Sequence, residues 1–182
     1  NRGRVIGRII EIGGEWYYDE AEPDEGGYYG RYRFDIESKQ RGEVVGYSKE
    51  AELFELKGYS VLELYDSNKL PLDRYEVQDK KGEVVARIVK VGEEWYYDEA
   101  RPDEEGYYGR YEFDINTGKK GKIIGYSKEA EFRIGGEKVL ELYDSAKKRL
   151  GRYEVQDNRG RVIGRIIEIG GEWYYDEAEP DE

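Results

Sequence analysis

Apolar and polar residues alternate along much of the chain. In 32–36, Tyr, Phe and Ile alternate with Arg and Asp, and 111–115 repeats this arrangement with one Glu in place of Arg. A period of two predicts β-strands with one apolar face. Tyr, Val and Ile are abundant and suit half-buried sheet surfaces. We therefore expect an all-β chain in which no helix exceeds a single turn.

Glycine-containing turns separate the expected strands. Four two-residue connections place Gly where a positive φ is needed, at 12–15, 56–59, 134–137 and 169–172. The pattern predicts six strands in each 78 residues and about fourteen in the chain. The first six are expected near 5–13, 15–21, 28–37, 43–56, 59–66 and 73–79.

The chain is built from repeats of about 78 residues. The segment Glu-Trp-Tyr-Tyr-Asp-Glu-Ala occurs at 15–21, 94–100 and 172–178. We expect one continuous array of tandem antiparallel β-hairpins without linkers. It comprises a partial repeat over 1–25, a repeat unit over 26–104 and a repeat unit over 105–182.

The two ends of the chain carry the same sequence. Residues 1–25 and 158–182 are identical at all 25 positions, whereas 80–104 differs from them at ten. This pattern predicts a segment of a longer array. Apolar residues fall on both faces of several strands, as in the adjacent Tyr17 and Tyr18, so the sheet is expected to be extended or coiled rather than a plain sandwich.

Two segments resemble tyrosine-aspartate (YD) repeats, whose pattern is Tyr-x-x-Asp-x-x-Gly-Arg-(Leu/Val). They are 75–84 and 153–162, which both read Tyr-Glu-Val-Gln-Asp-x-x-Gly-x-Val. The openings at Arg31 and Arg110 carry longer turns and depart from the pattern. The resemblance implies hairpin arrays of secreted or surface-borne bacterial proteins, some of which coil into shells around toxins. It also implies an extracellular scaffold without catalysis of its own.

Composition narrows the function classes. The chain has a net charge of −12 and 37% hydrophobic residues, with no His, Cys or Met. Acidity argues against a nucleic-acid partner, and no apolar run is long enough for membrane insertion. Because the chain has no imidazole and no thiol group, most types of catalytic site and metal site are excluded. We therefore expect no enzyme and no obligatory cofactor. High charge with few thermolabile residues is typical of thermostable proteins.

Acidic segments recur in each repeat and are candidates for a Ca²⁺ site, because Ca²⁺ takes six to eight oxygen ligands. The alternative is a solvated, solubilising loop. The candidate ligands are Asp19, Glu20, Glu22, Asp24, Glu25, Asp98, Glu99, Asp103, Glu104 and Glu105.

Recurrent aromatic residues beside these acids are candidates for stacking on sugar rings. They are Trp16, Tyr18, Trp95, Tyr97, Trp173 and Tyr175. Their recurrence in every repeat equally fits a repeated core.

Three functions follow from this pattern. The first is a structural segment of a long extracellular fibre, stalk or sheath, which binds copies of itself through strand edges or lateral contacts. The second is a repeat module at the cell surface that binds glycans or cations. The third is a coiled shell that encloses another polypeptide.

Overall fold

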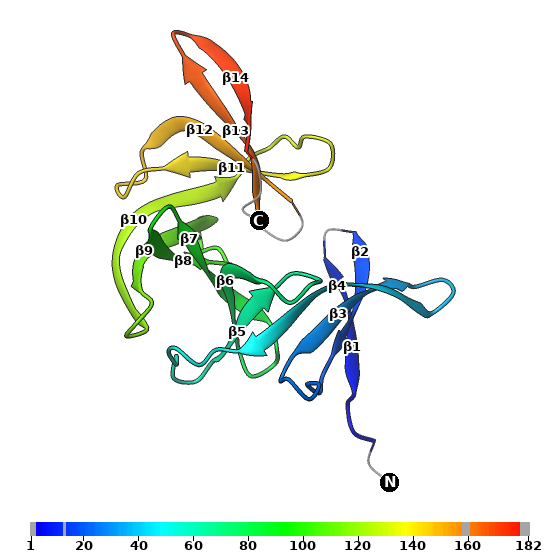
Figure 1. The fold of residues 1–182 in the computed structure, drawn as a ribbon. Coiled ribbons are helices and arrows are strands. Elements are labelled where there is room, and N and C mark those ends of the chain that lie inside the picture. The colour runs from blue at the N-terminus through cyan, green and yellow to red at the C-terminus, as the bar shows by residue number, and fades with distance from the viewer. Residues whose placement is uncertain (1–2, 13, 158–160, 179–182) are drawn as a thin grey trace.

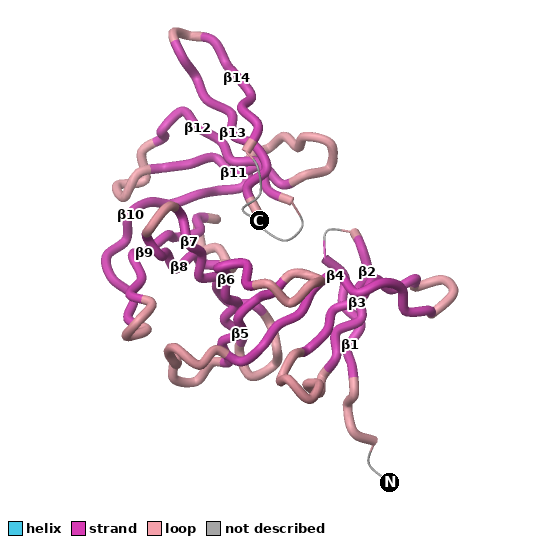
Figure 2. Tube along the Cα trace, in the orientation of Figure 1, coloured by secondary structure: helices cyan, strands magenta, loops and turns pink. Residues whose placement is uncertain are grey.

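The structure is a computed structural model that describes residues 3–12, 14–157 and 161–178. These residues form one sheet of 14 antiparallel strands, in which each strand pairs with its neighbours in the chain (Figure 1). The described residues contain strands and loops but no helix (Figure 2). Accordingly, they include no helix with the length and apolar character to cross a membrane. The predicted all-β array of hairpins is confirmed.

Six strands recur with the 78-residue period, as the sequence predicts. The first six are β1 (Gly7–Ile12), β2 (Glu15–Glu20), β3 (Tyr29–Asp35), β4 (Gln40–Glu50), β5 (Ser60–Tyr65) and β6 (Pro71–Gln78). Their counterparts are β7 (Val84–Val91), β8 (Glu94–Glu99), β9 (Tyr107–Asp114), β10 (Lys119–Glu129), β11 (Lys138–Tyr143) and β12 (Arg149–Gln156). The last two, β13 (Val162–Ile169) and β14 (Glu172–Glu177), repeat β1 and β2. Counted from β1, the first repeat holds β1 to β6 and the second holds β7 to β12.

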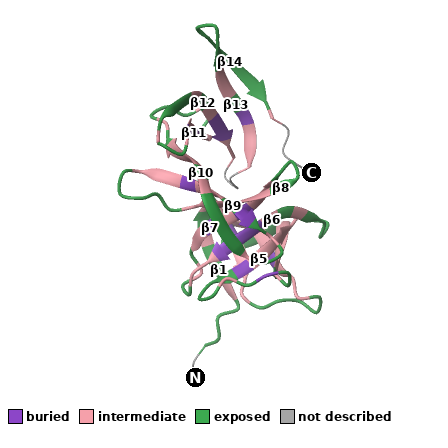
Figure 3. Cartoon of the chain, turned by 90° about the vertical axis from the view of Figure 1, so that its left-hand side faces the viewer, coloured by how far each residue is buried: buried purple, intermediate pink, exposed green. Residues whose placement is uncertain are grey.

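The sheet has two chemically different faces, because alternate residues of a strand point to opposite sides. One side, the core face, holds a buried cluster of Phe54, Val61, Tyr75, Val77, Ala86, Ile88 and Phe113. The other side, the polar face, holds charged residues together with apolar ones such as Leu140 and Leu142. Its charged residues include Arg74, Arg87, Asp98, Arg110 and Glu154. Figure 3 shows that buried residues extend as far as β12 and β13, while β14 is exposed along its length.

The segment after β4 differs from the prediction. The sequence suggested one strand over 43–56, but β4 ends at Glu50. Residues 51–56 leave the strand ladder, and the Phe54 ring packs against Tyr75 with 5.2 Å between centroids. The expected turn still forms, because the Tyr59 amide donates to the Leu56 carbonyl at 3.0 Å.

The next repeat reaches the same packing with one residue fewer. Phe132 lies 5.2 Å from Tyr153, matching the contact between Phe54 and Tyr75. A one-residue change inside a paired strand would turn every later side chain to the other face. The difference in length is therefore confined to an unpaired loop.

One turn type closes several hairpins. At Asp79, one carboxylate oxygen accepts hydrogen bonds from the amides of Lys81 at 2.9 Å and Glu83 at 3.0 Å, while Gly82 adopts a φ of 83°. This geometry is a type I turn followed by a left-handed residue. The same carboxylate contacts recur at Asp24, Asp66, Asp103 and Asp144. The Asp-x-x-Gly part of the YD-like segment 75–84 thus forms a hairpin turn. The corresponding turn after Asp157 lies outside the described residues.

Candidate functional site

The first acidic segment forms the loop between β2 and β3, and its carboxylates have separate roles. Asp19 binds Arg31 through two hydrogen bonds of 2.7 and 2.8 Å. Glu20 accepts the Gly30 amide at 2.8 Å. Asp24 accepts backbone amides of its own turn, and these hydrogen bonds lower the pKa of its carboxyl group. These contacts position β3 against β2.

The loop between β8 and β9 repeats these contacts. Asp98 binds Arg110 through two hydrogen bonds of 2.7 Å, and Glu99 accepts the Gly109 amide at 2.8 Å. Burial alone would lower the pKa of Arg110, but the hydrogen bonds and charge of Asp98 outweigh it and raise this pKa. Asp103 shapes the turn, and its pKa is lowered by the amides that it accepts.

The remaining candidate acids point in other directions. Glu22 pairs with Arg4 at 2.7 Å, and Glu105 lies 4.0 Å from Lys147. Glu25 and Glu104 are exposed. Within the described part of the chain, no three His, Cys, Asp or Glu side chains are arranged to hold a metal ion. The structure therefore does not bring the ten candidate carboxylates together.

The candidate sugar-stacking residues belong to the core face and its repeats. Trp95 lies 5.7 Å from Tyr75, and Tyr97 stacks on Phe113 at 6.2 Å. In the first repeat, Trp16 and Tyr18 are likewise half-buried. These four residues therefore contribute to packing.

The third copy of these aromatic residues is more accessible. Trp173 contacts Tyr153 at 5.7 Å but remains 51% exposed, and Tyr175 is 47% exposed. Both lie in β14, at the outer edge of the sheet. Their exposure sets this end apart from the interior of the array.

A cluster of tyrosine and lysine side chains was not predicted from the sequence. The Tyr28 ring lies 5.1 Å from Tyr65 and 6.0 Å from Tyr47, and the Lys69 ammonium sits 4.7 Å above it. Lys69 also reaches Asp24 at 3.3 Å. The second repeat rebuilds the cluster from Tyr107, Tyr126, Tyr143, Lys128 and Lys147.

The sequence of two turns carries a signal for this cluster, because each has a lysine where related turns have a glycine. Lys69 and Lys147 occupy left-handed turn positions, with φ of 65° and 64°, where the equivalent residues Gly27, Gly82 and Gly106 are glycines. A long side chain at a position that favours glycine indicates a compensating contact. That contact links the turn after β5 or β11 to the acidic loop.

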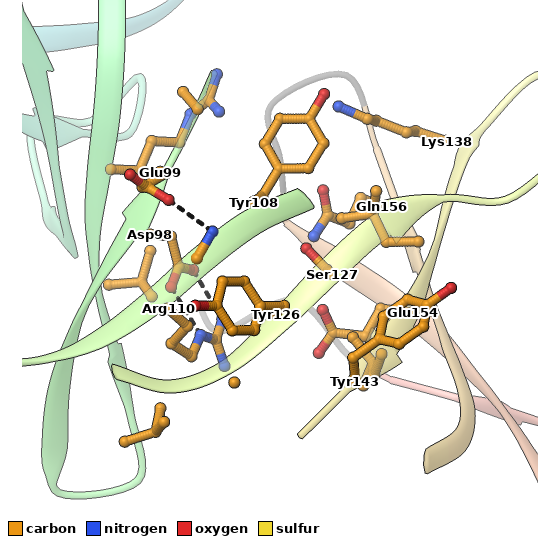
Figure 4. A pocket seen from close by; sticks show the side chains of 18 of the residues that line it. Asp98, Glu99, Tyr108, Arg110, Tyr126, Ser127, Lys138, Tyr143, Glu154 and Gln156 are labelled. Carbon is orange, nitrogen blue, oxygen red and sulfur yellow. Dashed lines mark hydrogen bonds and ion pairs between the residues drawn. The ribbon is translucent and has the colours of Figure 1, made fainter. Parts of the chain in front are cut away.

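The polar face is hollowed by a pocket of about 230 Å³. Its walls come from the strands β6 to β12, so the coiled sheet curves around it. Figure 4 shows Tyr108 beside Lys138 on one side and the pair Arg110 and Asp98 on the other. The Lys138 ammonium lies 5.0 Å from the centre of the Tyr108 ring. This arrangement offers one aromatic face and charges of both signs.

Arginines and carboxylates meet at one wall of this pocket. Burial, with the positive charges of Arg87 and Arg161, lowers the pKa of Arg74 to about 10, although the carboxylates of Asp157 and Asp98 partly offset this shift. The wall therefore presents charges of both signs.

Comparison with models of protein families and with curated proteins found no match to this chain.

Proposed function

We propose that this chain is a structural segment of a long extracellular fibre, stalk or sheath built from tandem β repeats. The observation that carries the proposal is the boundary between repeats, which is packed like a domain interior. Phe54 of the first repeat and Phe113 of the second are 6% and 7% exposed, and one core cluster spans both. Such a boundary allows repeats to be added without a linker.

The pattern of contacts supports the same role. Among the described residues, every extensive contact between strands joins strands that are neighbours in the chain. Stability in such arrays accumulates from repeats and their nearest-neighbour interfaces, so length can grow without a new core. A role of this kind requires no catalysis.

The test is immunogold electron microscopy on cells that produce the protein, with antibodies against the β3–β4 hairpin and against an intracellular control. We expect regularly spaced label along an extracellular fibre or sheath. Label confined to the cell interior would contradict the proposal.

A second candidate is the binding of an acidic saccharide in the pocket. Tyr108 offers a ring face for a sugar, and Arg87 and Lys138 offer positive charge for a carboxylate. Isothermal titration with oligogalacturonate tests it, using Arg87→Gln as the pocket variant and Arg133→Gln as an exposed control. Heat of binding that is lost only in Arg87→Gln would support this candidate, and equal heats in all three proteins would contradict it.

A further inference from the structure

The core face is uncovered at the β14 end of the sheet. Phe132 and Tyr175 are 44% and 47% exposed, whereas their counterparts Phe54 and Tyr97 are buried and half-buried. Within the described residues, no strand pairs with the outer edge of β14. Phe132, Trp173 and Tyr175 therefore form an exposed group, the terminal aromatic patch.

The interior of the array shows what covers such a patch. Phe113 in β9 lies 5.2 Å from Phe54 and 6.2 Å from Tyr97. The counterpart of β9 in the first repeat is β3, which carries Phe34 at the position of Phe113. Phe34 is only half-buried in its own chain. A β3 strand beside β14 would place Phe34 over the terminal aromatic patch.

The β13–β14 hairpin repeats the β1–β2 hairpin that pairs with β3. The segments 1–25 and 158–182, which contain the two hairpins, are identical at all 25 positions. They also share a close packing that the middle copy lacks: a Cβ on Gly7 would collide with the Tyr18 ring, and one on Gly164 with Tyr175. The middle copy carries Ala86 instead. The two hairpins thus match in shape as well as in sequence.

The residues of β2 that contact β3 have identical counterparts in β14. Asp19 binds Arg31 through two hydrogen bonds, and Glu20 accepts the Gly30 amide. On β14, the corresponding carboxylates are Asp176 and Glu177. Replacing one hairpin by the other therefore conserves these bonds.

We infer that the β13–β14 hairpin of one copy pairs with β3 of a second copy and displaces that copy's own β1–β2 hairpin. The exchange conserves the hairpin contacts and adds the contact between Phe34 and the terminal aromatic patch. Burial of these rings favours association, while the loss of translational freedom makes it depend on concentration. The inference rests on the proposed function, since it names the partner by which the array extends.

The inferred contact is head-to-tail, so each added copy exposes a new β14 edge. Contacts of this kind build open filaments unless the rotation between copies closes a ring. Adjacent copies would then be offset by 157 residues of sequence, because the shared 25 residues overlap. In this arrangement, β14 of one copy is followed in the sheet by β3 of the next copy, just as β8 is followed by β9 within one chain.

A pair of isomeric charge swaps tests the exchange. In Arg31→Asp/Asp176→Arg, the hairpin of another copy complements Asp at position 31, whereas the chain's own Asp19 repels it. In Arg31→Asp/Asp19→Arg, the chain's own hairpin complements position 31 and the other copy's Asp176 repels it. The two variants have the same composition and net charge, and each must first show a β-sheet circular-dichroism spectrum.

Sedimentation velocity over a range of concentrations measures the outcome at physiological salt. We expect Arg31→Asp/Asp176→Arg to associate at concentrations about tenfold or more below those needed by Arg31→Asp/Asp19→Arg, because like charges placed opposite each other disfavour pairing. Equal association of the two folded isomers would overturn the exchange. If the two isomers associate equally but the protein still forms extracellular fibres, the exchange is wrong and the proposed function remains supported.

Engineered disulfides give a readout that does not depend on the charge swaps. The chain has no native cysteine, and Arg33 pairs with Tyr17, whose counterpart in β14 is Tyr174. Oxidised Tyr174→Cys/Arg33→Cys is expected to give a ladder of covalent multimers on a non-reducing gel. The matched control is Tyr174→Cys/Glu112→Cys, because Glu112 in β9 faces Tyr96 of its own chain. The same pattern from both variants would overturn the exchange.

Discussion

The rings of Phe54 and Phe113 meet across a repeat boundary, with centroids 5.2 Å apart and planes inclined by 66°. Phe54 lies in the loop after β4, and Phe113 lies in β9 of the next repeat. Edge-to-face contacts of this kind add to the free energy of burying each ring. The strands β4 and β9 are separated by four other strands in the sheet, so this contact joins two different repeats.

Removing the Phe54 ring should therefore loosen the boundary. We expect Phe54→Ala to lower the free energy of unfolding by about 3 kcal/mol, as large-to-small changes of buried aromatic residues do. Phe132→Ala is the matched control, because Phe132 makes the same contact with Tyr153 but is 44% exposed. We expect Phe132→Ala to lower the free energy of unfolding by about 1 kcal/mol. Urea unfolding followed by tryptophan fluorescence measures both, and equal costs would contradict a buried boundary.

The turn between β9 and β10 should be intolerant of a side chain. Gly118 has a φ of 75°, and a Cβ there would lie 3.2 Å from the Glu55 carbonyl oxygen and from the Phe54 Cβ. We expect Gly118→Ala to cost more than the roughly 1–2 kcal/mol of a left-handed alanine alone.

The first repeat provides the opposite experiment at the same position. Lys39 has a φ of 62° where the second repeat has Gly118. We expect Lys39→Gly to raise the free energy of unfolding by about 1 kcal/mol, because glycine adopts this φ without strain. Thermal unfolding of both variants decides the matter, and a destabilised Lys39→Gly protein would refute this view of the turn.

The aspartate turns should make the fold sensitive to acid. Backbone hydrogen bonds lower the pKa of Asp79, Asp103 and Asp144 from the ordinary value of 3.8. A lowered pKa in the folded state contributes stability above pH 3.8, and that contribution is lost as the pH falls through the folded value. We expect the urea midpoint to fall as the pH is lowered from 5 to 3. Asp79→Asn should flatten this pH dependence, and an unchanged profile would contradict the role of that carboxylate.

Buried tyrosines should limit stability at high pH. Burial, with the nearby charges of Glu63 and Asp73, raises the pKa of Tyr75 to about 12. A raised pKa contributes stability that is complete below pH 10 and is lost as the pH rises toward 12. We expect the urea midpoint to fall over that range, and Tyr75→Phe should weaken the fall. Tyrosinate absorbance gives an independent measure. We expect it to rise at a higher pH in the folded protein than in the unfolded protein.

Sequence patterns predict most of the strands and several of the turns. Period-two alternation located the strand at 29–35, and glycine pairs located the turn at 169–172. Both signals are local, because they reflect the pleat of a strand and the φ that a turn requires.

The end of β4 could not be predicted from local signals. Residues 51–56 leave the sheet because Phe54 gains a partner, Phe113, that lies in another repeat. One clue was available: the corresponding segments 51–61 and 130–139 differ in length by one residue. Such a difference is incompatible with conserved strand register and indicates a loop.

The roles of the acidic residues depended on tertiary partners. Charge clustering correctly marked the loops after β2 and β8, but the sequence alone does not place Arg31 opposite Asp19 or Lys69 above Tyr28. Those positions follow from strand register and from contacts between different loops. The pocket likewise depends on the coiling of seven strands around one face.

We infer that this array extends by adding further copies at its β14 edge. Negative-stain electron microscopy of the purified protein, after incubation at increasing concentration, makes such growth visible. We predict unbranched threads that lengthen with concentration and are shorter in Arg31→Asp/Asp19→Arg. Single compact particles at every concentration would contradict the claim.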